Sequence, residues 1–171
     1  MNFSSSGLIL DSCVIINLLC SDLFYIFIES YRDIKIAEFV IVKEILPMSE
    51  KYSFNLEIPK RKLLVPNEKE SEMILELSRE IDDGESYSIA LAISRGLDLG
   101  TDDKKAIRLY ESFPNHKKLW NTPELIFRLF GNSNFTLNKQ EVLMNIKNKA
   151  KFIPSPKNPF YKEWIDILCN N

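Results

Sequence analysis

Short apolar segments alternate with helical segments over the first 130 residues of this chain, and this alternation restricts the folds open to it. Strands alternating with helices predict an α/β fold whose parallel sheet is covered by helices on both faces. The strand-like segments are residues 8–10, 37–42 (a strand or a helix start), 63–65, 97–101 and 119–120. At 171 residues the chain is long enough to bury a core without disulfides or other covalent links.

Local signals predict several helix ends. Ser12 can cap a helix that starts after the first strand, and Thr122 can cap another that has Pro123 at its first position. Gly96 is well placed to end the helix that opens at Glu85. An amphipathic helix is expected over residues 68–81 because its apolar positions recur at helical spacing.

Beyond Gly131 the pattern changes. Residues 137–150 and 160–168 look like appended helices joined by the proline-rich residues 154–159. We therefore expect a main domain over residues 1–131 and a helical extension over residues 132–171, packed on or beside it.

Charge is unevenly distributed along the chain. The net charge is −2, which excludes the uniformly basic surface of a sequence-indifferent nucleic-acid binder. Residues 67–103 carry eleven Asp and Glu against three Lys and Arg, whereas residues 136–162 carry six Lys and one Glu. The acidic region could hold cations and the basic one phosphate; the alternative is that both are solvated helix faces.

The cysteine and histidine content narrows the chemistry. Three cysteines without CxxC spacing indicate neither a disulfide framework nor a thiolate zinc site, and they favour a reducing cytoplasm. The single histidine, His116, excludes multi-histidine metal centres. The apolar run at residues 8–20 is too short for a membrane span and lacks a preceding positive charge, so we expect a cytoplasmic protein without membrane attachment.

Four acidic residues stand just after or inside apolar segments: Asp11, Glu44, Glu85 and Asp102. Ligands of parallel α/β sheets bind at the carboxyl ends of the strands, where Asp11 and Asp102 are expected. Glu85 can reach the same edge if Gly84 permits a tight helix start, and Glu44 comes from the neighbouring crossover. Clustered carboxylates repel unless a cation neutralises them, and oxygen ligands favour Mg²⁺ or Mn²⁺.

Each of these residues also has a simpler interpretation. Asp11 could merely cap the first helix, Glu85 and Asp102 could each be a favourable charge at a helix start, and Glu44 could be an ordinary residue of an amphipathic helix. Lys104, Lys105 and Arg108, one turn beyond Asp102, could contact an RNA backbone or simply form the wet face of a helix.

The arrangement of these residues resembles the PIN domain. The likeness rests on residues 11–18 (DSCVIINL), Glu44, residues 84–92 (GESYSIALA) and residues 101–106 (TDDKKA), and it extends over roughly residues 7–130. It is strongest between residues 84 and 106, which are close to PIN proteins of the DUF3368 type. The chain departs from the family pattern at Cys13 and Gly100 and in its long C-terminal extension.

The resemblance implies a Rossmann-like three-layer α/β/α fold with a short parallel sheet of four to five strands. It also implies a metal-dependent endoribonuclease that cleaves single-stranded RNA, as do the VapC-like toxins of toxin–antitoxin pairs. Asp11, Glu85, Asp102 and Asp103 would then hold the metal, and Glu44 would join the catalytic set. Ser12, Asn17 and Thr101 would support the carboxylates.

The resemblance leaves partners and alternatives open. It implies an antitoxin or regulatory protein as a partner, and a homodimer, which is common in the family. One alternative is a catalytically inactive PIN-fold subunit that binds or scaffolds within an RNA-processing or defence assembly. A DNA nuclease of the flap type is a less favoured alternative, because its helical arch and basic clamp are not evident in the sequence.

Overall fold

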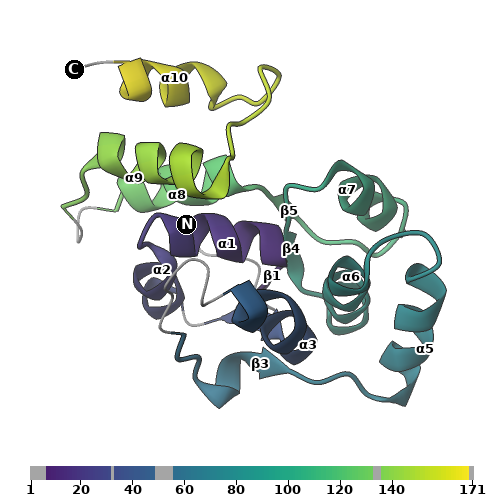
Figure 1. Ribbon diagram of the computed structural model, residues 1–171. Coiled ribbons are helices and arrows are strands. Elements are labelled where there is room, and N and C mark those ends of the chain that lie inside the picture. The colour runs from purple at the N-terminus through teal and green to yellow at the C-terminus, as the bar shows by residue number, and fades with distance from the viewer. Residues whose placement is uncertain (1–6, 32, 49–55, 133–135, 170–171) are drawn as a thin grey trace.

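The computed structural model describes residues 7–31, 33–48, 56–132 and 136–169 (Figure 1). Five strands in these ranges form a parallel sheet in the order β3-β2-β1-β4-β5. The strands are β1 (Leu8–Leu10), β2 (Ile34–Ala37), β3 (Leu63–Leu64), β4 (Asp98–Gly100) and β5 (Leu119–Trp120). In the central strand β1, Leu8 lies opposite Ile34 of β2 and Asp98 of β4. The predicted fold class is confirmed: a parallel sheet flanked by helices, in a Rossmann-like three-layer α/β/α arrangement.

The helices cover both faces of the sheet, except the last two, which pack outside this layer. They are α1 (Ser12–Cys20), α2 (Phe24–Ser30), α3 (Glu38–Val40), α5 (Glu68–Leu77), α6 (Asp83–Arg95), α7 (Lys104–Glu111), α8 (Thr122–Phe130), α9 (Lys139–Asn145) and α10 (Tyr161–Cys169). The π-helical turns η1 (Ile41–Ile45) and η3 (Ile146–Ala150) continue α3 and α9, and the 3-10 turn η2 (Lys60–Lys62) precedes β3. α6 contacts β1, β2 and β4 and has α5 and α7 beside it, whereas α1 contacts α2, α8 and η3.

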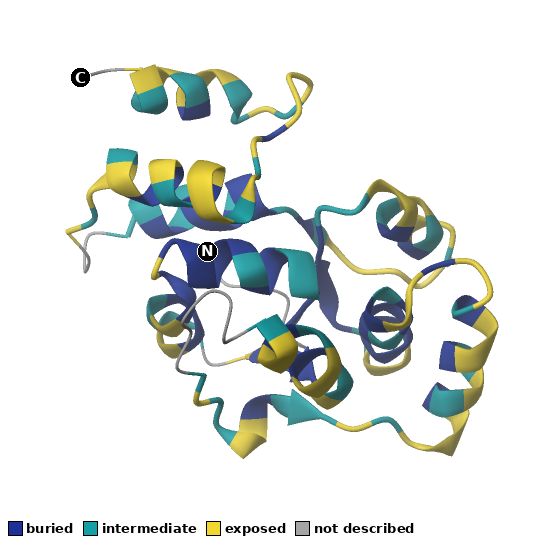
Figure 2. Ribbon diagram, viewed as in Figure 1, coloured by how far each residue is buried: buried dark blue, intermediate teal, exposed yellow. Residues whose placement is uncertain are grey.

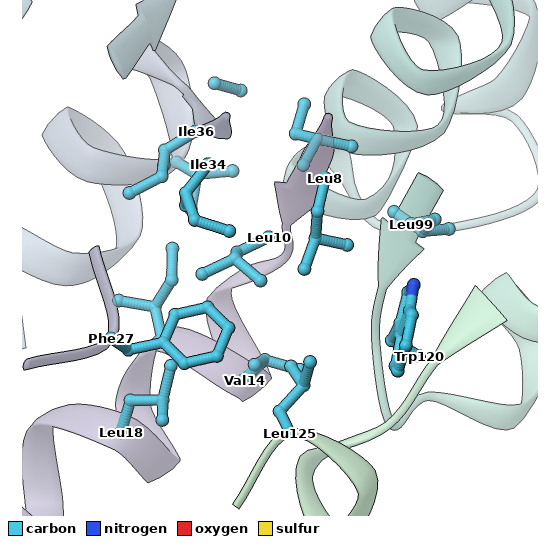
Figure 3. Packing of buried hydrophobic residues seen from close by; sticks show 14 of the residues in the cluster. Leu8, Leu10, Val14, Leu18, Phe27, Ile34, Ile36, Leu99, Trp120 and Leu125 are labelled. Carbon is cyan, nitrogen blue, oxygen red and sulfur yellow. The ribbon is translucent and has the colours of Figure 1, made fainter. Parts of the chain in front are cut away.

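The core surrounds β1. All three residues of this strand are fully buried, as expected for a parallel strand with helices on both faces. Figure 3 shows Leu10 close to Val14 and Phe27, side chains from α1 and α2, and Figure 2 shows α1 and the strands as largely buried. A β-carbon at Gly100 would lie 2.9 Å from Cδ2 of Leu10, so this unusual glycine lets β4 pack closely on β1.

Two predicted helix caps are wrong by one residue. Asp11, not Ser12, is the N-cap of α1, because its carboxylate accepts a hydrogen bond from the Ser12 amide. Asn121, not Thr122, is the N-cap of α8, because its Oδ1 accepts from the amide of Glu124. Ser12 and Thr122 are instead the first residues of their helices. Gly96 ends α6 in the left-handed conformation (φ +62), which confirms that prediction.

Two predicted elements differ in extent. The segment expected over residues 37–42 is a strand only up to Ala37, and helix α3 begins at Glu38. The amphipathic helix expected over residues 68–81 ends at Leu77. Its buried Glu70 forms an ion pair with Arg95 at 2.8 Å, which joins α5 to the end of α6.

The C-terminal extension packs on the α1 and α8 side of the molecule, where η3 contacts α1 and α10 contacts α9 (Figure 1). Trp164 of α10 is fully buried, and the ring of Phe160 stacks on Phe127 of α8 at 5.0 Å. No single helix in the described ranges is long and apolar enough to cross a membrane; α1 and α2 meet that test only together, as a pair bent by 114°.

Candidate metal site at the carboxyl end of the sheet

Asp11 lies where the central strand ends, and its buried carboxylate is held by three donors. Oδ2 accepts from the Thr101 hydroxyl at 3.0 Å and from the Cys13 thiol at 3.4 Å. Oδ1 accepts from the amide of Ser12 at 2.8 Å. Because Thr101 follows β4, these bonds join the ends of β1 and β4 and fix the carboxylate in position.

Glu44 reaches this edge from η1. Its carboxylate occupies the space directly beside Gly84, where a β-carbon would collide with the side-chain oxygens. Glycine at position 84 therefore makes room for Glu44 next to the start of α6. This space-making role explains the residue better than the tight helix start expected from the sequence.

Burial and like charges raise the pKa values of two carboxyl groups in this cluster. The pKa of Asp11 rises from 3.8 to about 6, mainly because the group is buried and further because Glu44 is near. The pKa of Glu85 rises from 4.5 to about 7 through burial and the charges of Asp103, Asp11 and Asp82. Charge repulsion therefore links Asp11 with Glu44, and Glu85 with Asp11 and Asp103, and we call these four residues the acidic cluster.

Asp102 does not turn toward the acidic cluster. Its Oδ1 accepts from the Thr122 amide at 2.9 Å, and its Oδ2 accepts from the Thr122 hydroxyl and from Asn17 Nδ2, the latter at 3.2 Å. Burial still raises its pKa. All four acids were expected to converge on one pocket. Asp102 departs from this expectation because Thr122 and Asn17 supply hydrogen-bond donors at the junction of β5 and α8.

Asp103 takes the place near Glu85 that the sequence assigned to Asp102. Its Oδ1 accepts from the amides of Lys105 and Ala106 at 2.7 and 2.9 Å, so it also caps α7. The capping role and the place in the acidic cluster are compatible, because a carboxylate has two oxygens and several lone pairs.

Two residues of this edge were missed by the sequence interpretation. Cys13, which the sequence showed only as a departure from the family pattern, donates to Asp11 and accepts a hydrogen bond from the Asp102 amide at 3.3 Å. Its pKa lies well above the usual range through burial and the charges of Asp11 and Asp102, so the thiol stays protonated and can donate. Thr122, expected as a helix cap, is the second residue after β5, and its position close behind a strand end was the available signal.

The predicted RNA-binding residues all lie on α7. Lys104, Lys105 and Arg108 are exposed, and Arg108 Nε donates to the Lys104 carbonyl at 3.2 Å. Lys104 borders a groove that also reaches Asp102, whereas Lys105 and Arg108 border a separate depression beside Glu80. Only Lys104 therefore shares a groove with one of the predicted site residues.

The acidic cluster has the donor chemistry of a site for a hard divalent cation, because its ligand atoms are carboxylate oxygens. Raised pKa values at Asp11 and Glu85 fit such a group, since a cation would relieve the repulsion. Within the described ranges, no three His, Cys, Asp or Glu side chains already stand at metal-ligand spacing. A cation that bound here would need these side chains to move closer together, and Glu44 and Glu85 are the partly exposed members of the set.

In metal-free buffer, the free energy of unfolding is expected to fall as pH rises from about 4 to about 7. The folded-state pKa values of Asp11 and Glu85 lie above 3.8 and 4.5, so the native state holds more protons than the unfolded state in this interval. At ~1.4 kcal/mol per pKa unit, Asp11 alone accounts for a loss of at most about 3 kcal/mol in the free energy of unfolding. The more exposed Glu85 accounts for a smaller loss.

Urea denaturation at pH 4.5, 6 and 8 in EDTA measures this slope. Mn²⁺ is expected to restore the stability lost at pH 8, and Asp11→Asn to remove most of the slope. Stability that stays constant between pH 4.5 and 8 would contradict the electrostatic description of the cluster.

Comparison with known proteins shows the fold but no family. No family model matches the chain, and no curated protein matches it. Among solved structures, the crystal structure of PAE2754 from Pyrobaculum aerophilum is similar, with a TM-score of 0.50 and 15% sequence identity, over 74% of this chain and 98% of that chain. At this identity the similarity concerns the fold alone.

Proposed function

We propose that this protein is a PIN-type endoribonuclease that cleaves single-stranded RNA at the acidic cluster with the help of Mg²⁺ or Mn²⁺. The observation that carries the proposal is the acidic cluster at the carboxyl end of the sheet, in which Asp11 and Glu85 have raised pKa values and are affected by the charges of neighbouring carboxylates. The resemblance of residues 84–106 to PIN proteins supports the same activity.

In this proposal each residue of the site has a defined task. Asp11, Glu85 and Asp103 would hold the cation, and Glu44 would orient a water molecule by accepting its hydrogen bond. Thr101 and the Ser12 amide keep Asp11 in place. A bound divalent cation supplies positive charge that stabilises the developing charge on phosphate and lowers the pKa of a coordinated water.

Asp102 would act as a positioning residue. Its bonds to Thr122 and Asn17 fix the turn between β4 and α7. The neighbouring Asp103 is thereby held on the side of Glu85. We accordingly place Asp102 outside the direct ligands, although the sequence favoured it as one.

A cleavage assay on the purified full-length chain tests the proposal. Single-stranded RNA is expected to be cleaved with Mg²⁺ or Mn²⁺ and to stay intact in EDTA. Because water is the proposed nucleophile, a strand with 2′-deoxyribose at the cleavage position should still be cut, whereas attack by the RNA 2′-hydroxyl would require that group. Cleavage that is insensitive to EDTA would refute the assignment.

A second candidate function is a PIN-type subunit that binds RNA or a protein without cleaving. Two observations favour it: Asp102 is fully engaged by Thr122 and Asn17, and the described carboxylates are not already at ligand spacing. Isothermal calorimetry with Mn²⁺ separates the two candidates. If the protein is a nuclease, it should bind Mn²⁺, and Glu85→Gln should bind it more weakly. A subunit that only binds RNA or protein needs no bound cation.

A further inference from the structure

A groove of about 640 Å³ lies between the start of α7 and the C-terminal extension. Asp102 and Lys104 border it on the α7 side, Asn121 and Pro123 lie at the start of α8, and residues 152–161 form the opposite wall. In Figure 1 the segment leading to α10 rises on the side that faces α7. The groove therefore joins the end of β4 to a part of the chain outside the predicted main domain.

The wall formed by residues 152–161 is held in one conformation. Pro154 and Pro156 restrict the backbone of this segment. The Asn158 carboxamide accepts a hydrogen bond from the Phe160 amide at 2.9 Å, and the Phe152 ring packs edge-on against Trp164 at 6.0 Å. A ligand would meet a preformed surface and would pay little ordering entropy on binding.

The same wall exposes apolar and aromatic groups. Ile153 is 45% exposed, and Phe152 and Tyr161 are partly exposed beside it. Unpaired nucleobases bind to such surfaces by stacking, whereas bases inside a duplex are covered by their neighbours. The surface is thus suited to the flat faces of bases from a single strand.

The charge around the wall is complementary to a phosphate backbone. Residues 151–162 include Lys151, Lys157 and Lys162 and contain no Asp or Glu. Lys104 adds an exposed positive charge on the opposite side of the groove. The charged residues that line the groove are Lys104 and Asp102, so the excess positive charge comes from the exposed lysines of the neighbouring wall segment. Positive charge beside apolar base platforms is the usual combination in proteins that bind single strands.

We propose that this groove binds the single-stranded RNA substrate beside the cleavage site, with bases against Ile153 and Tyr161 and phosphates near Lys104 and the lysines of residues 151–162. The proposal rests on the proposed nuclease function, because Asp102 lines the groove and the next residue, Asp103, belongs to the acidic cluster. The C-terminal extension then determines which stretch of RNA is presented to the carboxylates.

Charge variants at Ile153 test the groove without altering the acidic cluster. In the Glu85→Gln background, which keeps the strand intact, binding of a fluorescent single-stranded RNA is measured by anisotropy with full-length protein. Ile153→Asp is expected to raise the Kd about tenfold or more, and Ile153→Lys to leave it unchanged or lower it. Val65→Asp, at a 60% exposed position after β3, is the matched control and should have no effect.

Lys104→Glu provides a second test on the opposite wall and should also weaken binding. The proposed RNA-binding role of the groove would be refuted if RNA affinity were equal in Ile153→Asp, Ile153→Lys and Lys104→Glu. It would also be refuted if the wild-type protein bound a duplex as tightly as a single strand. A wild-type protein that binds a peptide but no RNA would overturn it as well.

RNA cleavage is measured separately, with protein that retains Glu85. If Ile153→Asp weakens binding but no protein cleaves RNA, the groove stands and the nuclease assignment fails. If cleavage is metal-dependent while binding ignores Ile153 and Lys104, the nuclease stands and the groove fails.

Discussion

Replacing Glu85 with glutamine is expected to slow RNA cleavage by at least about a hundredfold, beyond the 10–100-fold typical of residues that only support a metal ligand. The neutral amide cannot balance the charge of a cation or relieve its repulsion from Asp11 and Asp103. For the same reason, the metal-free variant should be more stable than the wild type at pH 8, because one of the repelling charges is gone.

Slower cleavage together with higher stability distinguishes the loss of a metal ligand from damage to the fold, which would lower both. Initial cleavage rates with Mn²⁺ and urea denaturation in EDTA measure the two quantities on the same preparation. Glu76→Gln, on the exposed surface of α5, is the matched control and should change neither. Wild-type cleavage rates in Glu85→Gln would remove Glu85 from the site.

Alanine at position 164 is expected to cost about 3–5 kcal/mol in the free energy of unfolding, the range for a buried aromatic side chain. Trp164 is fully buried, and its ring lies 6.3 Å from Phe127 of α8 and 6.0 Å from Phe152. The substitution would leave a large cavity between the C-terminal extension and α8. Urea denaturation of the full-length chain measures the loss.

Phenylalanine is the matched control at this position. The indole Nε1 of Trp164 is buried without a hydrogen-bond partner in the described ranges, so Trp164→Phe removes volume but no hydrogen bond. Its cost should be less than half that of alanine. If alanine costs under about 1 kcal/mol, the extension is an appendage rather than part of the cooperative unit.

The central strand β1 was predictable because burial on both faces leaves a simple pattern, whereas β2 shares only Ala37 with the expected segment 37–42. Residues 8–10 are apolar without interruption, and Gly96 marks the end of α6 by a backbone conformation that favours glycine. The helix N-caps at positions 11 and 121 were harder to predict. Asp11 and Ser12, or Asn121 and Thr122, can both cap a helix, and the backbone conformation that decides between them is set by the preceding strand.

The chain positions of the acidic residues could be read from the sequence, but the orientation of their side chains could not. The sequence indicates acids at the ends of β1 and β4, yet it cannot show which of Asp102 and Asp103 turns toward Glu85. That choice depends on Asn17 and Thr122, which lie 85 and 20 residues away from Asp102 along the chain. The role of Cys13 depends in the same way on a contact with the Asp102 amide, 89 residues away.

The placement of β1 in the middle of the sheet has a consequence for biosynthesis. Asp11 and Thr101 are separated by 90 residues, so a ribosome releases the first long before the second exists. Until that stretch has emerged, β1 lacks its β4 neighbour and the carboxylates remain far apart. A nascent chain therefore has no assembled acidic cluster, and any activity that depends on it begins only after most of the polypeptide has been made.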